Sequence, residues 1–138
     1  MDMYREDVLD HYENPRNQGE LTGEDVKTAR DSNASCGDMV QFYIRIAKSS
    51  DRSPKSAQGS ELIIAEVKWK GIGCAITTAA ASKLSEYLQG QALQDVSKMS
   101  EEELLKKGIG FEVNPGRMKC LMLPVKVVKK VFTLTPKI

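Results

Sequence analysis

The sequence has almost no net charge and no long apolar run. Its 20 Lys and Arg residues are nearly balanced by 19 Asp and Glu residues, which leaves a formal charge of +1. This balance gives no overall attraction to nucleic acid or to an anionic membrane surface. No apolar run approaches the roughly 18 residues of a membrane-spanning helix, and the first six residues lack signal-peptide character. We therefore expect a cytoplasmic protein that binds neither nucleic acid nor membranes.

Cysteine and histidine are scarce, and their numbers argue against a disulfide framework. The chain has three cysteines and one histidine, and an odd number of cysteines cannot pair internally. In a cytosolic protein such a set indicates metal binding or catalysis. No CxxC pair anchors a zinc motif, so the spacing alone is weak evidence. His11 is expected on a helix surface rather than as a ligand.

The length permits one hydrophobic core. A chain of 138 residues with 41% hydrophobic content is too short for two comfortable cores, so we expect a single domain over residues 1–138. The first helix follows Asp2 and ends near Pro15, because a residue before proline avoids the helical region. Nothing in its pattern ties this helix strongly to the rest of the chain.

Two segments alternate apolar and polar residues with the period of a half-buried strand. They are Val40–Ile46 and Ile63–Trp69, joined by a polar hairpin over 49–60, and they are expected to pair antiparallel. Val26–Arg30 is predicted as a short edge strand. The expected buried faces comprise Val40, Phe42, Ile44 and Ile46 of the first segment and Ile63, Ala65, Val67 and Trp69 of the second.

Helical periodicity dominates the second half of the chain. The stretch Gly71–Cys74 joins a strand to a helix, and its glycines are expected to turn the backbone sharply and leave the sulfur uncovered. A capping box at Ser100 opens a short helix that Gly108 is expected to close. A final helix is expected to start close to Cys120, since Pro124 is tolerated only in a first turn.

The predicted elements bring the cysteines together. Cys36 precedes the first strand of the antiparallel pair and Cys74 follows the second, so both meet at one end of the sheet, while Cys120 lies near another helix start. With Asp38, they offer three thiolates and a carboxylate, which suit zinc or an iron–sulfur cluster. The alternatives are cysteines packed as small hydrophobes and a turn role for Asp38. Lys119 is expected either to be solvated or to lower the pKa of the neighbouring thiol.

Four blocks in order resemble the signatures of U-type iron–sulfur cluster scaffolds, the family of IscU, SufU and the N-terminal domain of NifU. The blocks are Asp10–Asn17, Ala34–Asp38, Gly71–Ile76 and Arg117–Cys120. The resemblance implies an α+β fold of IscU/SufE-like architecture, in which a small antiparallel three-stranded sheet packs against helices. It also implies that the cysteines and the aspartate lie at one exposed end.

The same resemblance implies a cofactor and partners. Cys36, Asp38, Cys74 and Cys120 would bind a transient [2Fe-2S] cluster or Zn²⁺. Sulfur would arrive as a persulfide from a cysteine desulfurase, with Cys74 and Cys120 as candidate persulfide acceptors, and the cluster would leave for apo iron–sulfur acceptor proteins. A monomer or weak homo-oligomer is expected.

Details of the blocks separate the subtypes. IscU-type members carry histidine directly before the third cysteine, whereas this chain has Lys119, and Cys74 is followed directly by Ala75-Ile76. Both features resemble SufU-type members, although the insertion usual in that subtype is absent. Three hypotheses follow: a non-enzymatic scaffold, a zinc-dependent sulfurtransferase that serves a cysteine desulfurase, and a zinc ion that only stabilises the fold.

Overall fold

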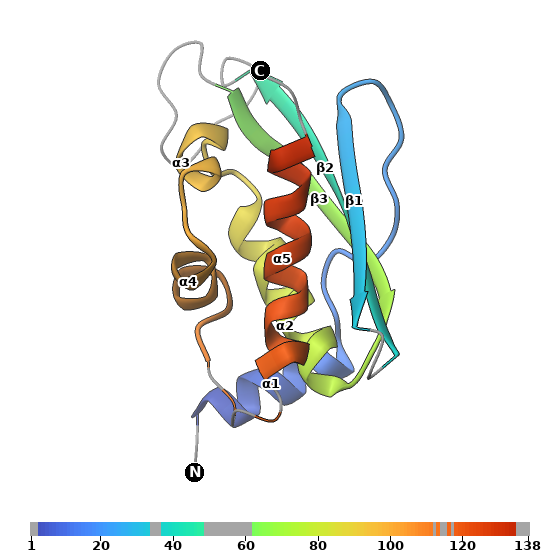
Figure 1. Ribbon diagram of the computed structural model, residues 1–138, viewed down its shortest axis with the longest axis vertical. Coiled ribbons are helices and arrows are strands. Elements are labelled where there is room, and N and C mark those ends of the chain that lie inside the picture. Colours follow the sequence, from blue (N-terminus) through green and yellow to red (C-terminus); the bar gives the residue numbers. More distant parts are fainter. Residues whose placement is uncertain are drawn as a thin grey trace.

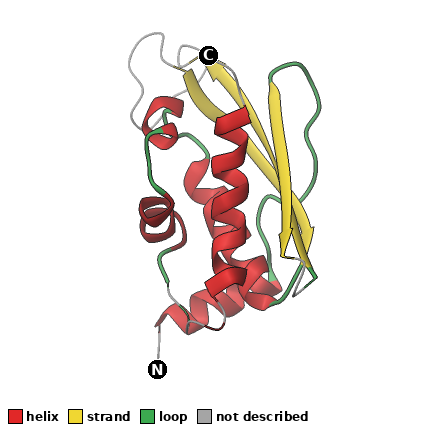
Figure 2. Ribbon diagram, in the orientation of Figure 1, coloured by secondary structure: helices red, strands yellow, loops and turns green. Residues whose placement is uncertain are grey.

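The computed structural model describes residues 3–33, 37–48, 62–111, 113, 116 and 118–134. Its secondary structure is that of an α+β protein (Figures 1 and 2). The elements in chain order are α1 (Met3–Glu13), β1 (Val26–Asn33), β2 (Asp38–Lys48), β3 (Leu62–Ile72), α2 (Ala75–Leu88), α3 (Leu93–Ser97), α4 (Glu101–Leu104), the π-helical turn η2 (Leu105–Ile109) and α5 (Met118–Leu134).

The three strands form one antiparallel sheet in the order β1-β2-β3, which confirms the predicted fold class. Phe42 lies opposite Ala29 on one side and Trp69 on the other. Strand β1 runs to Asn33, three residues beyond the predicted edge strand. Asn33 pairs with Asp38, one of the predicted ligands and the first residue of β2.

A β-bulge changes the predicted inner face of β3. Register shifts between Arg45 and Ile46, so that Ile46 pairs with Ile64 and Ala65 is the extra residue. Ile64 is therefore fully buried, whereas Ala65 is only half-buried. The prediction that Ala65 shares the buried face was wrong, because strict alternation cannot reveal a bulge.

Helices α2 and α5 cover the inner face of the sheet. Figure 1 shows α5 lying lengthwise against the strands, with α2 beside it and α3 and α4 on the side away from β1. Helix α2 carries three consecutive, fully buried alanines, Ala79–Ala81, which permit close packing against its neighbours, and α5 contributes Leu121, Val125 and Val128, all fully buried. Burying each of these larger side chains contributes about 1.5–3 kcal/mol.

The helical segment that α4 opens begins as predicted, but it continues through η2 to Ile109. Ser100 and Glu103 form a reciprocal capping box. Gly108 does not close the helix: it lies inside η2, where an added Cβ would approach Leu84 Cδ1 to 2.6 Å. Gly110 terminates the turn in the left-handed region, with φ of 81°. The sequence shows two glycines, and only the packing decides which one ends the helix.

Helix α1 is anchored on α2, contrary to the prediction that nothing ties it down strongly. His11 is buried and hydrogen bonded to Ser82 Oγ at 2.7 Å, so its expected place on a helix surface was also wrong. Lys83 forms an ion pair with Asp7. The segment after α1 is fixed as well, since Trp69 Nε1 donates to the Arg16 carbonyl at 2.8 Å.

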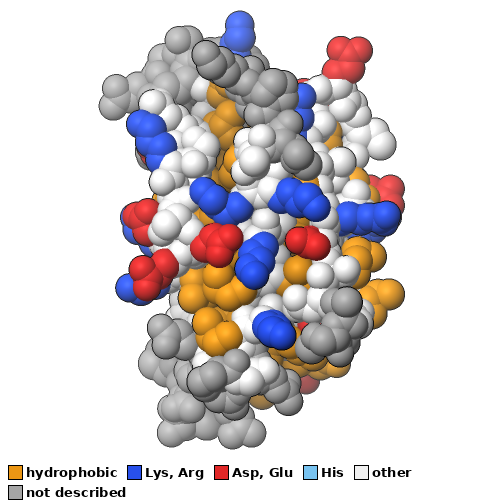
Figure 3. All heavy atoms as spheres, in the orientation of Figure 1, with side chains coloured by type: hydrophobic (Ala, Val, Ile, Leu, Met, Phe, Trp, Pro, Cys, Tyr) orange, Lys and Arg blue, Asp and Glu red, His pale blue; other side chains and the backbone are white. Residues whose placement is uncertain are grey.

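Surface charge is mixed. On the face shown in Figure 3, basic and acidic side chains are interspersed over the middle of the molecule. Within the described ranges, no helix combines the length and apolarity needed to cross a membrane.

Candidate metal and cluster site

Three of the four predicted ligands lie together at one end of the sheet. One ligand atom from each of Asp38, Cys74 and Cys120 lies within 4.8 Å of the other two. Asp38 is the first residue of β2, Cys74 directly precedes α2, and Cys120 is the third residue of α5. These starts meet at the lower end of Figure 1. The fourth predicted ligand, Cys36, lies outside the described residues.

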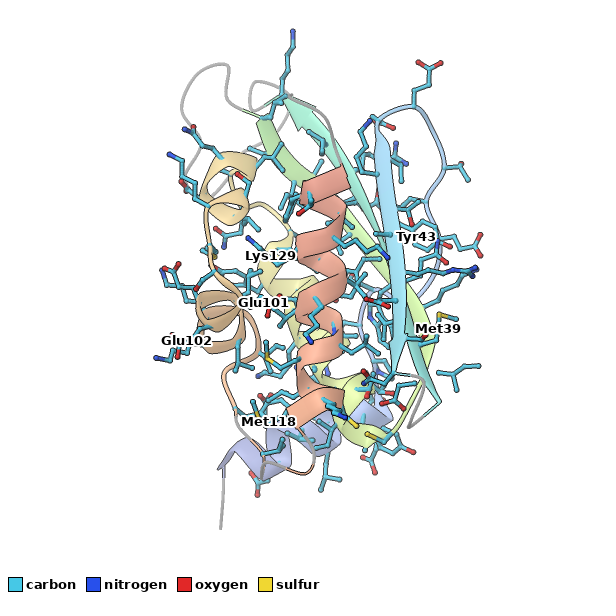
Figure 4. All side chains as sticks on the ribbon, viewed as in Figure 1. Met39, Tyr43, Glu101, Glu102, Met118 and Lys129 are labelled. Atoms are coloured by element: carbon cyan, nitrogen blue, oxygen red, sulfur yellow. The ribbon has the colours of Figure 1, made fainter. Side chains whose placement is uncertain are left out.

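Access to this group is unequal. Asp38 and Cys120 are 4% and 7% exposed, whereas Cys74 is half-buried. The expectation of an exposed site is therefore wrong for Asp38 and Cys120, and Cys74 is only partly exposed. Figure 4 labels Met39 and Met118, the neighbours of this site at the starts of β2 and α5. Solvent and small reagents can reach the group mainly through the Cys74 sulfur.

The two glycines before Cys74 allow close packing. A Cβ at Gly71 would lie 2.3 Å from the Met39 carbonyl oxygen on the neighbouring strand, and one at Gly73 would lie 2.9 Å from Thr77 Cβ and Cγ2. Neither glycine has a positive φ. What they provide is space, for β2 at Gly71 and for the Thr77 side chain at Gly73. Their expected role in a sharp turn between β3 and α2 stays a prediction.

Thr77 connects the three ligands and was missed in the sequence. Its hydroxyl donates to Asp38 Oδ2 at 3.0 Å and lies 3.6 Å from Cys74 Sγ. It also lies 3.4 Å from the carbonyl oxygen of Cys120. One signal was available: residues three apart share a helix face, so a threonine three residues after Cys74 points toward the same space.

Pro124 explains why the Cys120 carbonyl lacks the usual hydrogen bond within its own helix. Helix α5 begins at Met118, two residues before Cys120, which leaves Pro124 inside the helix and not in its first turn as predicted. Proline has no N–H for the carbonyl four residues earlier, and here that carbonyl belongs to Cys120. The Thr77 hydroxyl approaches this oxygen at 3.4 Å, while its one hydrogen has a nearer acceptor in Asp38 Oδ2.

Comparison with known proteins decides the family. The model of the NifU-like N terminal domain matches residues 3–133. The chain belongs to this family. The iron–sulfur cluster assembly scaffold protein IscU of Haemophilus influenzae is 29% identical over 91% of this chain and 90% of its own length. The mitochondrial iron sulfur cluster assembly protein 1 of Yarrowia lipolytica is 30% identical over 94% of this chain, which spans 65% of that protein.

A solved structure shares the fold. It is a protein of Fervidobacterium islandicum AW-1 assigned to the SUF system as an iron–sulfur cluster assembly scaffold. It matches with a TM-score of 0.61 and 25% identity, covering 92% of this chain and 94% of that one. The family predicted from the four sequence blocks is thereby confirmed. The closer likeness to SufU-type members stays a prediction.

In this NifU-like domain the two described thiols differ in acidity. Burial alone would raise the pKa of Cys74, but hydrogen bonds from the Thr77 backbone N–H, the Thr77 hydroxyl and the Cys120 thiol outweigh burial. They hold that pKa below its ordinary value. A lower pKa favours the thiolate, the form that attacks sulfur and binds metal.

Cys120 is the opposite case. Burial, a hydrogen bond with Asp38 and the adjacent Cys74 sulfur raise the pKa of the Cys120 thiol to about 12. Lys119 was expected either to be solvated or to lower this pKa. Its side chain is exposed to water, as the first alternative predicts, and its carbonyl accepts from Asn33 Nδ2 at 3.1 Å. At neutral pH Cys120 therefore keeps its proton until a metal ion displaces it.

The donor set fits a metal ion. Zinc–sulfur bonds of about 2.3 Å in a tetrahedral site place neighbouring ligand atoms roughly 3.8 Å apart. The observed limit of 4.8 Å requires only small side-chain movements to reach that spacing. Two sulfur atoms and one carboxylate oxygen leave one tetrahedral position to be filled.

Proposed function

We propose that this protein is a scaffold for iron–sulfur cluster assembly. Iron and sulfur are its cargo: they combine on Cys36, Asp38, Cys74 and Cys120 into a transient [2Fe-2S] cluster, which then passes to apo acceptor proteins. The observation that carries the proposal is the clustering of three of these ligand atoms within 4.8 Å. Membership of the NifU-like family and the scaffold name of the Haemophilus relative support it.

The ligand set suits temporary binding. Thiolates bind iron–sulfur clusters, whereas the single carboxylate is a harder donor and a weaker partner for such a cluster. Asp38 would therefore be the ligand that yields on release. Cys36 completes the set in this proposal because it lies only two residues before Asp38 in the sequence.

Sulfur would come from a cysteine desulfurase as a persulfide. Of the two cysteines that the structure describes, Cys74 is the better acceptor. It is the more accessible of the two described cysteines, and its pKa is lowered. In this step the Cys74 thiolate bonds to the outer sulfur of the desulfurase persulfide. The bond between the two persulfide sulfurs breaks, and the desulfurase cysteine leaves as a thiolate.

Anaerobic reconstitution tests the proposal. The protein would be incubated with a cysteine desulfurase, cysteine and ferrous iron, then mixed with an apo-ferredoxin. A visible absorption spectrum of a [2Fe-2S] cluster that later appears on the ferredoxin is the expected result. Absence of any transferable cluster would overturn the scaffold.

Asp38→Ala sharpens this test. Removing the weak ligand is expected to lengthen the half-life of the bound cluster and slow its transfer to apo-ferredoxin, both followed by absorption. A cluster lost faster than from the wild type would contradict the release role of Asp38.

The second candidate is a zinc-dependent sulfurtransferase, favoured by the acidity and accessibility of Cys74. It predicts faster desulfurase turnover without cluster formation in the same incubation. A zinc ion that only stabilises the fold predicts neither result. The cytoplasmic location and the monomeric or weakly oligomeric state stay predictions from the sequence.

A further inference from the structure

Thr77 is the one polar side chain, among the described residues, that reaches all three clustered ligands. It is 2% exposed and it approaches the Asp38 carboxylate, the Cys74 sulfur and the Cys120 carbonyl at 3.0, 3.6 and 3.4 Å. These three residues come from three different elements, and Thr77 belongs to the first turn of α2. The hydroxyl is therefore the common point of the site.

A hydroxyl has one hydrogen to donate, and Asp38 Oδ2 is its nearest acceptor. That bond engages one carboxylate oxygen and fixes the rotation of the carboxylate, so the other oxygen is the freer one for a metal ion. Hydrogen bonds of this kind orient metal-binding carboxylates, and losing them typically lowers metal affinity about 10–100-fold.

We propose that Thr77 is the positioning residue of this site: its hydroxyl holds Asp38 so that the carboxylate presents a single oxygen to the metal, and this sets how tightly the site binds. The role rests on the proposed function, because it requires that Asp38, Cys74 and Cys120 bind a metal. Thr77 itself is not a ligand.

The surrounding chain is built around this side chain. Gly73 leaves the space that the Thr77 methyl group occupies, since a Cβ there would lie 2.9 Å from Thr77 Cγ2. Pro124 withholds the N–H that would otherwise compete for the Cys120 carbonyl. Both residues keep the Thr77 hydroxyl between the ligands.

Three variants separate the hydroxyl from the shape of the side chain. Thr77→Val keeps the volume and removes the hydroxyl, Thr77→Ser keeps the hydroxyl and removes the methyl group, and Thr78→Val makes the same change at the next residue. Thr78 is half-buried, and within the described ranges its hydroxyl makes no hydrogen bond to Asp38, Cys74 or Cys120. Circular dichroism and the thermal midpoint would verify folding of each variant.

The readout is anaerobic Co²⁺ binding, measured by sulfur-to-cobalt charge-transfer and ligand-field absorption in competition with a chelator. Thr77→Val is expected to bind Co²⁺ about 10–100-fold more weakly with a shifted ligand-field band, while Thr77→Ser and Thr78→Val stay within about threefold of the wild type.

The contrary outcomes are distinct. Wild-type affinity and spectrum in Thr77→Val would overturn the positioning role and leave the proposed function standing. Equal losses in the Val and Ser variants would assign the effect to the methyl group and overturn the role of the hydroxyl. A wild-type protein that binds no Co²⁺ would overturn the proposed function and the role of Thr77 with it.

Discussion

Helix α2 contributes buried hydroxyl groups to two polar clusters that differ in their balance of donors and acceptors. The anchoring cluster fixes the N-terminal segment and consists of Ser82, Ser85, His11, Arg16 and Asn17. The ligand cluster lies at the start of the helix and consists of Thr77, Asp38, Cys74 and Cys120.

In the anchoring cluster both serine hydroxyls are hydrogen bonded. Ser82 Oγ accepts from the Arg16 N–H at 2.9 Å and bonds His11, while Ser85 Oγ donates to the Ser82 carbonyl at 2.7 Å and accepts from Asn17 Nδ2 at 3.0 Å. Among the described residues, Arg16 Nη1 is left as a buried donor without a hydrogen-bond partner, so the excess in this cluster is of donors and not of acceptors.

In the ligand cluster two donors, the Thr77 hydroxyl and the Cys120 thiol, stand against the Asp38 carboxylate, the Cys120 carbonyl and the Cys74 sulfur. Electron-pair donors exceed hydrogen-bond donors, and a cation satisfies such an excess better than another hydroxyl would. This excess of electron-pair donors, rather than burial, distinguishes the candidate site from the anchoring cluster.

The largest expected difference comes from Cys74→Ser. Replacing a soft thiolate with a hydroxyl of similar shape is expected to lower Co²⁺ affinity more than about 100-fold, beyond the effect of losing a supporting hydrogen bond. The thermal midpoint of the apo protein should change little. Chelator competition measures the affinity, and unchanged Co²⁺ binding would remove Cys74 from the ligand set.

Ser82→Ala is the matching change in the anchoring cluster. It leaves buried partners at His11 and Arg16 without a hydrogen bond, so the free energy of unfolding is expected to fall by about 1–3 kcal/mol, measured by urea denaturation. Co²⁺ affinity of the folded protein should not change. Ser97→Ala is the control, because that hydroxyl is exposed and bonds only its own helix at Gln94. A large loss of Co²⁺ affinity in Ser82→Ala would show that the two clusters are coupled and would contradict their separate roles.

Alkylation of the apo protein is expected to distinguish the thiols within the ligand cluster. A thiolate forms as pH rises through the thiol pKa, so Cys74, with its lowered pKa, should react with iodoacetamide at a lower pH than an ordinary cysteine does. Cys120, with a pKa of about 12, should stay protonated and unreactive there. Mass spectrometry of the separate peptides measures both rates. Faster labelling of Cys120 would reverse the assignment of Cys74 as sulfur acceptor.

Pro124→Ala should have the smallest effect. It restores an N–H for the Cys120 carbonyl, which the Thr77 hydroxyl approaches at 3.4 Å, and a typical hydrogen bond contributes little net free energy, so the change in stability is expected to be about 1 kcal/mol or less. Thermal unfolding measures it. A destabilisation of several kcal/mol would show that Pro124 serves the helix in another way.

The sequence predicted the family, the three-stranded antiparallel sheet and most element starts. Alternation of Val40–Ile46 identified β2, and helical spacing after Cys74 identified α2, because these signals repeat over several residues. Bringing Cys74 near Asp38 also followed from sequence, since an antiparallel pair returns the chain to the same end of the sheet. Ligand roles for these residues, and for Cys36, stay predictions.

Single-residue details escaped the sequence. Ile64 and not Ala65 faces the core because of one bulge, and Gly110 rather than Gly108 ends η2 because Leu84 fills the space beside Gly108. His11 looked like a surface residue because its partner Ser82 lies 71 positions away. Nothing local signals such partners.

The sequence by itself determined which residues can bind a metal and roughly where they converge, because ligand chemistry and strand order are properties of the chain. Only the tertiary structure decided the exposure, the acidity and the orientation of these residues. It buried Cys120 and raised its pKa, left Cys74 accessible and acidic, and placed the Thr77 hydroxyl between them. Acidity and orientation depend on neighbours in space, and those neighbours come from elements far apart in the chain.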